Sequence, residues 1–205
     1  MSANTALTSL SCHDNQLTSL DVSSNTALSS FECTSNQITA LDVSNNTELS
    51  WFKCGDNQLT SLDVSSNPNL TFLVCSHNQL TYLNMKNGLT DQLTNFYATG
   101  NSSLTCIETL DPDYATENWT NIDEGVTFDV ICGGTDLTTW HVATTGSDGS
   151  GSGTEASPLA SIQTAINAST DGDTVSVAAG TYVENLVFGG KNLSLFGADS
   201  SNTII

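Results

Sequence analysis

The sequence predicts an all-β protein made of two thin parallel β-solenoids, and three observations support this prediction. A unit of 21 residues repeats through the first part of the chain. Ser, Thr and Asn supply 76 of the 205 residues, and the apolar fraction of 38% is low for a domain with one thick core. The second part alternates short apolar segments with Gly, Asn and Asp. A fixed period indicates units that bury their apolar faces only against their neighbours.

The period is visible at three kinds of residue. Steps of 21 residues connect the cysteines Cys12, Cys33, Cys54 and Cys75, the asparagines Asn15, Asn36, Asn57 and Asn78, and the leucines Leu20, Leu41, Leu62 and Leu83. Each unit has two halves, LxxLxCxxNQ and LxxLDVSxNxx, and each half predicts one short strand whose side chains alternate between core and solvent. Stacked units would therefore form two parallel sheets around a thin core.

The repeated Asn and Cys residues have structural interpretations. Asn amides can bond turn backbone groups that would otherwise be buried and unpaired. A tetrahedral zinc site needs four convergent ligands, which a straight row of one cysteine per coil cannot supply. We therefore interpret the four repeated cysteines as small, buried core residues.

These motifs make residues 1–88 resemble the bacterial leucine-rich repeats of 21 residues with a nested double motif. Residues 89–132 lose the period and would form the C-terminal cap of the repeat solenoid. Within them Cys106, the segment NWTNID and Cys132 resemble the C-terminal end of repeat proteins secreted by Bacteroidetes-type bacteria. That resemblance implies a disulfide between Cys106 and Cys132, and hence an oxidising compartment.

A second module is predicted beyond a linker at residues 133–139. Pro158 can open a helix, along which Leu159, Ile162, Ala165 and Ile166 recur with helical spacing. Short strands are predicted over residues 174–177, 186–188, 193–195 and 203–205.

In residues 140–205, the segments GSDGSGSGTEASPLASIQTAI, GDTV, GTYVEN and KNLSLFG resemble the N-terminal start of right-handed parallel β-helices of the pectin-lyase-like type. This resemblance implies a truncated parallel β-helix whose one short helix caps the first coil. Both ends of the sequence look internal, because Met1 is in phase with the core residue Val22 and Ile205 ends in a predicted strand. We expect earlier coils, a signal peptide and further β-helix coils to lie outside this sequence.

The outward positions of the first-half strands differ from coil to coil. They read Ser11, Glu32, Lys53 and Val74, and two residues earlier Ser9, Ser30, Trp51 and Phe72. Outward strand positions that tolerate any residue without harm to the fold are free to vary in sequence and to become part of a ligand-binding surface. Trp51 and Phe72 would lie on adjacent coils about 5 Å apart, where aromatic rings suit stacking on sugars or anchoring a protein. The candidate ligand-binding residues are Glu32, Trp51, Lys53, Phe72 and Val74; the alternative is cross-strand packing that only shields the sheet.

The outward positions of the second-half strands are nearly uniform, with Asp21, Asp42 and Asp63 in successive coils. Their oxygens are the ligand type that Ca²⁺ prefers, so a weak Ca²⁺ site is one interpretation. A solvated acidic stripe is the favoured one. We expect no other cofactor.

Charge excludes several classes of partner. The chain has 22 acidic residues, three lysines, no arginine and a net charge of −19, so it lacks the basic clusters that nucleic-acid binding requires. No apolar stretch reaches the roughly 18 residues of a membrane span. GxSxG and HExxH are both missing from the sequence, and we predict no catalytic residues in this chain.

The favoured function is therefore an extracellular or cell-surface recognition or adhesion protein that binds a protein or glycan through the variable repeat face. One alternative is the N-terminal part of a secreted, pectate-lyase-like polysaccharide-degrading enzyme, with the repeats as its targeting module. The other is a structural surface stalk.

Overall fold

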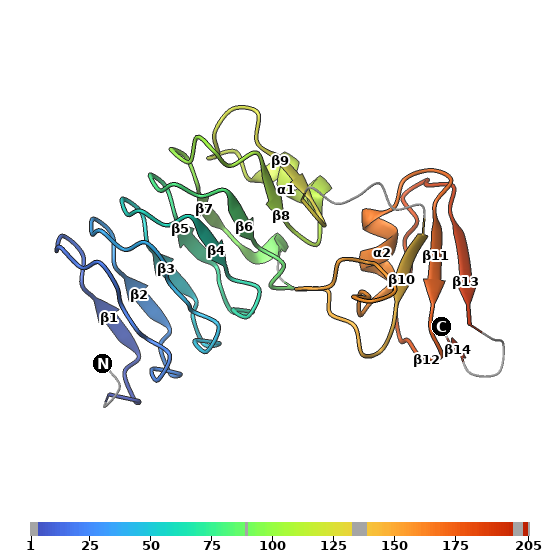
Figure 1. Ribbon diagram of the computed structural model, residues 1–205, viewed down its shortest axis with the longest axis horizontal. Helices are drawn as coiled ribbons and strands as arrows, with labels where there is room; N and C mark the ends of the chain where they lie inside the picture. Colours follow the sequence, from blue (N-terminus) through green and yellow to red (C-terminus); the bar gives the residue numbers. More distant parts are fainter. Residues whose placement is uncertain (1–3, 89, 133–138, 199–202, 205) are drawn as a thin grey trace. The chain divides into compact units, whose positions relative to one another are not determined.

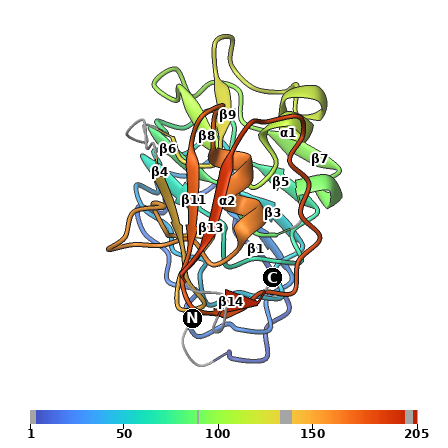
Figure 2. The ribbon, with the colours of Figure 1, turned by 90° about the vertical axis from the view of Figure 1, so that its right-hand side faces the viewer.

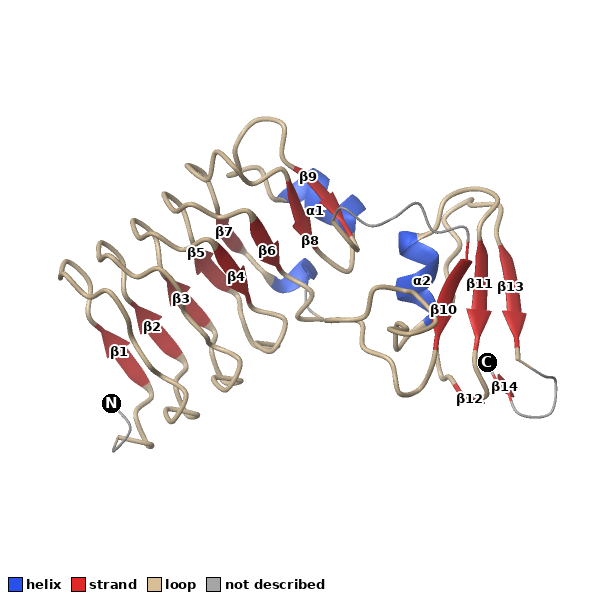
Figure 3. Cartoon of the chain, in the orientation of Figure 1, coloured by secondary structure: helices blue, strands red, loops and turns tan. Residues whose placement is uncertain are grey.

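The computed structural model describes residues 4–88, 90–132, 139–198 and 203–204. The expectations about Met1, Ile205 and residues 133–138 of the linker lie outside the described residues. The chain divides into two compact units, Met1–Asp129 and Val130–Ile205. Both are built from stacked parallel strands with few helices, as Figure 3 shows. The predicted all-β solenoid fold is confirmed. The division of the first unit into repeats and cap stays a prediction.

Sheet A runs along one side of the first unit (Figure 1). Its five parallel strands, in spatial order, are β1 (Ser9–Ser11), β2 (Ser30–Glu32), β3 (Trp51–Lys53), β5 (Phe72–Val74) and β7 (Asn95–Tyr97). The register pairs each residue with its counterpart one repeat later, so that Phe31 lies beside Phe52. The middle residue of each strand points into the core and the two flanking residues point outward, as the alternation of a β-strand requires.

Sheet B runs along the other side of the first unit. Its four parallel strands are β4 (Ser61–Asp63), β6 (Tyr82–Asn84), β8 (Cys106–Glu108) and β9 (Thr127–Asp129). The prediction of a strand in every second half is wrong for the first two coils, where residues 20–22 and 41–43 form no strand. There the bonds from Gln37 N to Leu17 O and from Gln58 N to Ile38 O link adjacent coils without a continuous ladder.

Residues 89–132 extend both sheets, because they contain β7, β8 and β9. They also contain a 3₁₀ turn, η1 (Thr90–Gln92), and the helix α1 (Pro112–Asn118), which begins at a proline and is capped by the Asp111 carboxylate. Trp119 follows α1 and packs against Phe96 and Phe128, with ring centroids 4.8 and 5.7 Å away. The core of the repeats thus continues into this segment.

The repeated asparagines hold the turns as predicted. The Asn57 amide nitrogen donates to the carbonyls of Cys33, Cys54 and Gly55 at 3.0–3.2 Å, and its oxygen accepts from Ile38 N. The residue before each asparagine has a positive φ, at Asp14, Ser35, Asp56 and His77. In the next coil that position is Gly100, with φ of 75°.

The second unit contains a three-stranded parallel sheet, sheet C, and a two-stranded one. Sheet C has the order β10 (Thr139–Val142), β11 (Thr174–Val177) and β13 (Ser194–Gly197), and β12 (Gly180–Thr181) pairs with β14 (Thr203–Ile204). The helix α2 (Ile162–Ala168) packs on β10 and β11, as Figure 2 shows. β10 begins at Thr139, the last residue of the expected linker.

Two local predictions in the second unit are wrong. Residues 186–188 form no strand. The helix does not begin at Pro158, because Leu159 exchanges backbone bonds with His141 and Ala143 as an isolated bridge beside β10. The helix begins only after Ser161, whose hydroxyl accepts a bond from Thr164 N at 3.2 Å.

Candidate functional site

The exposed face of sheet A carries the residues that differ most between coils. Its core-facing residues, one from the middle of each strand, are Leu10, Phe31, Phe52, Leu73 and Phe96. The outward residues change from serines in β1 to charged and aromatic residues in β3, β5 and β7. The structure thus brings the five predicted binding residues together on three adjacent strands.

Three aromatic side chains follow one another across this face, and we name Trp51, Phe72 and Tyr97 the aromatic row. The Trp51 and Phe72 rings stack with centroids 5.4 Å apart and an interplanar angle of 24°. The Phe72 and Tyr97 rings are tilted by 45° with centroids 6.4 Å apart. Tyr97 is 37% exposed. Sheet register positions these rings, because it pairs Trp51 with Phe72 and Val74 with Tyr97.

A charged pair borders the aromatic row. The Lys53 ammonium lies 4.5 Å from the Trp51 ring centroid and 5.8 Å from that of Phe72. The same ammonium is 3.8 Å from a Glu32 carboxylate oxygen, and both side chains are half-buried. A cation over an aromatic ring is attracted by the ring quadrupole, so Lys53 is held against the row while its charge stays near solvent.

The ring geometry restricts what the face can bind. Phe72 has Trp51 on one side and Tyr97 on the other, and Lys53 lies close to both Trp51 and Phe72. The faces of Trp51 and Phe72 that meet are therefore occupied, whereas Tyr97 is tilted away from Phe72 and keeps 37% of its surface exposed. The cross-strand packing considered as the alternative is present, and it coexists with partial exposure of the three rings.

Tyr97 and Asn95 belong to this face although sequence reasoning did not find them. The step from Phe72 to Asn95 is 23 residues rather than 21, so a search at the repeat period misses them. A signal was present, because Leu93-Thr94-Asn95-Phe96-Tyr97 follows the same pattern as Leu70-Thr71-Phe72-Leu73-Val74.

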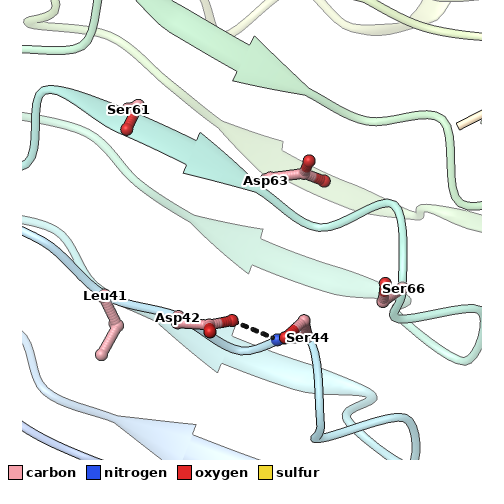
Figure 4. A pocket seen from close by; sticks show the side chains of 6 residues that line it. All are labelled: Leu41, Asp42, Ser44, Ser61, Asp63 and Ser66. Atoms are coloured by element: carbon pink, nitrogen blue, oxygen red, sulfur yellow. Dashed lines mark hydrogen bonds between the residues drawn. The ribbon is translucent and has the colours of Figure 1, made fainter. Parts of the chain in front are cut away.

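The predicted acidic stripe has a local structural role. The carboxylates of Asp21, Asp42 and Asp63 each accept a bond from the backbone N–H two residues later, at 2.8–2.9 Å. Bonds from Ser23 and Ser44 lower the pKa values of Asp21 and Asp42. Asp42 and Asp63 line a shallow hollow with serines from adjacent coils (Figure 4). In the described part of the chain, no group of three or more His, Cys, Asp or Glu side chains is placed to hold a metal ion.

The polar groups on sheet B bond to one another. The Tyr82 hydroxyl donates to a Glu108 carboxylate oxygen at 3.3 Å, and the Lys86 ammonium pairs with that oxygen at 2.9 Å. Burial, together with the Glu108 and Asp63 charges, raises the pKa of Tyr82. Lys86 and Glu108 are buried, whereas Tyr82 is 37% exposed.

The cysteines fall into two classes. Cys106 and Cys132 are both disulfide-bonded. Cys12, Cys33, Cys54 and Cys75 are free thiols, and the last three are buried. They line the core as predicted.

No family model matches the chain, and no curated protein matches it. Among solved structures, it is similar to one described as the functional domain of InlJ from Listeria monocytogenes, which includes a cysteine ladder. The identity is 22% and the TM-score 0.36, over 96% of this chain and 45% of that chain. The chain thus spans less than half the length of that structure. Its own coils establish a parallel β-solenoid of 21-residue repeats with an aromatic and charged face on sheet A.

Proposed function

We propose that the chain is an extracellular or cell-surface recognition protein that binds a partner protein through the exposed face of sheet A. The binding surface consists of the aromatic row with Glu32, Lys53 and Val74. The observation that supports this most is the contrast between the two sides of each strand. The interior repeats from coil to coil, whereas the exterior gathers three aromatic residues and an ion pair on neighbouring strands.

A protein fits this face better than a glycan does. Sugars stack on the flat faces of aromatic rings, and the faces of Trp51 and Phe72 that meet are already occupied by each other. Partly exposed aromatic rings beside a charged pair suit the mixed surface of a protein partner, where Trp and Tyr commonly contribute much of the binding energy.

The extracellular location rests on the covalent chemistry of the chain. Cys106 and Cys132 are disulfide-bonded, and such bonds persist mainly in oxidising compartments. Among the described residues, no helix is both long and apolar enough to cross a bilayer.

We also propose a family for each of the two units. The second unit is the start of a pectin-lyase-like β-helix, which is supported by its parallel coils and by α2 packed on β10 and β11. The first unit belongs with secreted repeat proteins of Bacteroidetes-type bacteria, which is supported by its NWTNID segment between Cys106 and Cys132.

Parallel arrays of extracellular proteins and of glycans would test the binding function. The wild type is compared with a Trp51→Ser, Phe72→Ser double variant and with a Ser9→Ala, Ser30→Ala control from the same face. We expect specific array proteins to bind the wild type and the control, and to lose at least tenfold in affinity for the double variant. Circular dichroism should show that both variants still melt cooperatively.

Three outcomes would contradict the proposal. They are no protein bound by the wild type, protein binding that survives the double substitution, and binding of glycans alone through the aromatic row. The last outcome would instead support the glycan alternative.

A further inference from the structure

A polar hollow lies beside β7, the last strand of sheet A. Its walls come from η1, β7, α1 and the turn that follows α1. Figure 2 shows α1 and the 3₁₀ turn on the side of the first unit where β7 ends the sheet. We name this feature the cap hollow and define it by six of its lining residues: Asp91, Asn95, Tyr97, Tyr114, Asn118 and Asn121.

The lining of the cap hollow is rich in groups that both donate and accept hydrogen bonds. Three of the six residues are asparagines and two are tyrosines. The amide nitrogens of Asn95 and Asn118 donate to Thr94 Oγ1 at 3.0 Å and to Tyr114 O at 2.8 Å. These two bonds use the amide nitrogens as donors. The amide oxygens of Asn95 and Asn118 can therefore accept hydrogen bonds from a ligand hydroxyl.

The charge of the site selects against anions. Asp91 contributes a carboxylate, and none of the lining residues is Lys, Arg or His. The chain as a whole carries a net charge of −19. A ligand with many hydroxyls and no negative charge matches such a lining.

A buried donor without an acceptor is a second, independent observation at this place. Trp119 lines the cap hollow and is 4% exposed. Its indole N–H has no hydrogen-bond partner among the described residues. Buried donors in folded proteins nearly always have a partner, and an unpaired one costs free energy. The nitrogen has almost no exposed surface, so a ligand acceptor would reach this N–H, and remove that cost, only if the side chains that cover it shift.

We propose that the cap hollow binds a unit of a neutral saccharide. Asn95, Asn118 and Asn121 would bond its hydroxyls, with the Tyr97 and Trp119 side chains lining the site. This site adjoins the partner-protein surface on sheet A: Tyr97 belongs to both, and Asn95 lies on the same face beside Phe72.

Nuclear magnetic resonance tests the proposal directly, because the chain has three tryptophans and therefore three indole N–H signals. The ¹⁵N-labelled full chain is titrated with maltohexaose, cellohexaose and xylohexaose, and with hexagalacturonate as the anionic comparison. A Trp119→Phe variant, which keeps an aromatic ring in the core, assigns the Trp119 signal. We expect at least one neutral probe to shift the Trp119 indole and the amides of Asn118 and Asn121. Hexagalacturonate should bind at least tenfold more weakly.

Variants separate this site from the face of sheet A. Asn118→Ala with Asn121→Ala should raise the dissociation constant of the neutral probe at least tenfold, as should the single variant Asn95→Ala. Glu117→Gln is the matched control, because Glu117 is exposed on α1 outside the lining and should leave binding unchanged. The Trp51→Ser, Phe72→Ser variant should also bind the saccharide normally, so the two proposals fail independently. No shift with any neutral probe, shifts confined to Trp51, or unchanged affinity in both asparagine variants would overturn the proposal.

Discussion

Glu184 and Lys191 hold opposite ends of the same short helix, α2. The Glu184 carboxylate accepts bonds from the backbone N–H groups of Ile162 and Gln163, both at 2.9 Å. The Lys191 ammonium donates to the carbonyls of Ile166 and Asn167 at 3.0 and 2.7 Å. Both charges complement the helix dipole and satisfy backbone groups that have no partner inside the helix.

Replacing Lys191 by methionine should destabilise the second unit. The substitution keeps most of the apolar stem and removes two charge-assisted bonds, so we expect the free energy of unfolding to fall by about 1–3 kcal/mol. Urea denaturation followed by circular dichroism measures the change. Lys191→Arg, which retains a donor, should lose less, and an unchanged free energy of unfolding in Lys191→Met would show that the bonds contribute little.

A second prediction concerns the glycine-rich loop before α2, which is packed rather than free. A Cβ at Gly146 would overlap the backbone carbonyl of Leu159 and lie 2.7 Å from Pro158 O. We expect Gly146→Ala to lower the free energy of unfolding by about 1–3 kcal/mol, because backbone atoms cannot move aside as side chains can. Gly172→Ala is the control: its surroundings are open, so it should cost only the roughly 1 kcal/mol of its positive φ. Thermal melts of both variants decide the comparison.

The sequence predicted the coils well because each coil repeats its core and turn residues. Leu, Cys and Asn at steps of 21 residues are enough to place β1, β2, β3 and β5 of sheet A in register. The sequence could not show that sheet B starts only at β4, because the LDVS segment is the same in coils with and without a strand there. The difference lies in hydrogen bonds between coils.

The candidate sites were predictable only where they follow the repeat. Trp51 and Phe72 were found because they occupy equivalent slots, whereas Tyr97 was missed because two extra residues precede it. The cap hollow depends on α1 and η1 coming together beside β7, and these elements share no period. In the same way, the ends of α2 are held by Glu184 and Lys191, which lie too far along the chain to act as a local capping signal.

Ser35→Gly should stabilise the first unit. Ser35 has a φ of 57°, a conformation that glycine adopts without steric cost and other residues adopt at a cost of about 1 kcal/mol or more. We expect a gain of about 1 kcal/mol in the free energy of unfolding, measured by denaturant titration. Ser30→Gly in β2, where φ is not positive, should be destabilising instead. A loss at Ser35 equal to that at Ser30 would contradict this reading of the turn.

Acid should weaken the turns that follow the aspartates of the acidic stripe. The hydroxyl and N–H of Ser44 lower the pKa of Asp42 below its ordinary value of 3.8. A lowered pKa in the folded state means that the stabilisation is present above about pH 4 and is lost as pH falls through the folded pKa. Asp42→Asn keeps an acceptor oxygen at this position but removes the titratable group. An asparagine can make the same kind of bond, because the side-chain oxygen of Asn84 accepts from Lys86 N, two residues later. Between pH 6 and pH 3 the melting temperature of the wild type should therefore fall slightly more than that of the variant. Equal falls in melting temperature would contradict the prediction.

The free cysteines should react in an order set by burial. The thiolate is the nucleophile in alkylation, and burial raises the pKa of Cys33 and of Cys75 to about 12 and that of Cys54 well above its ordinary value. Cys12 is only half-buried, and its pKa is raised by partial burial and by the Glu32 charge. Iodoacetamide at pH 8 should therefore label Cys12 first and leave the other three thiols unreacted in the folded chain, as peptide mass spectrometry would show. Guanidinium should make all four thiols reactive, whereas Cys106 and Cys132 should react only after reduction. Labelling of Cys54 as fast as Cys12 in the native protein would mean that the coils open locally, and the core of the repeats would then be less stable than its packing indicates.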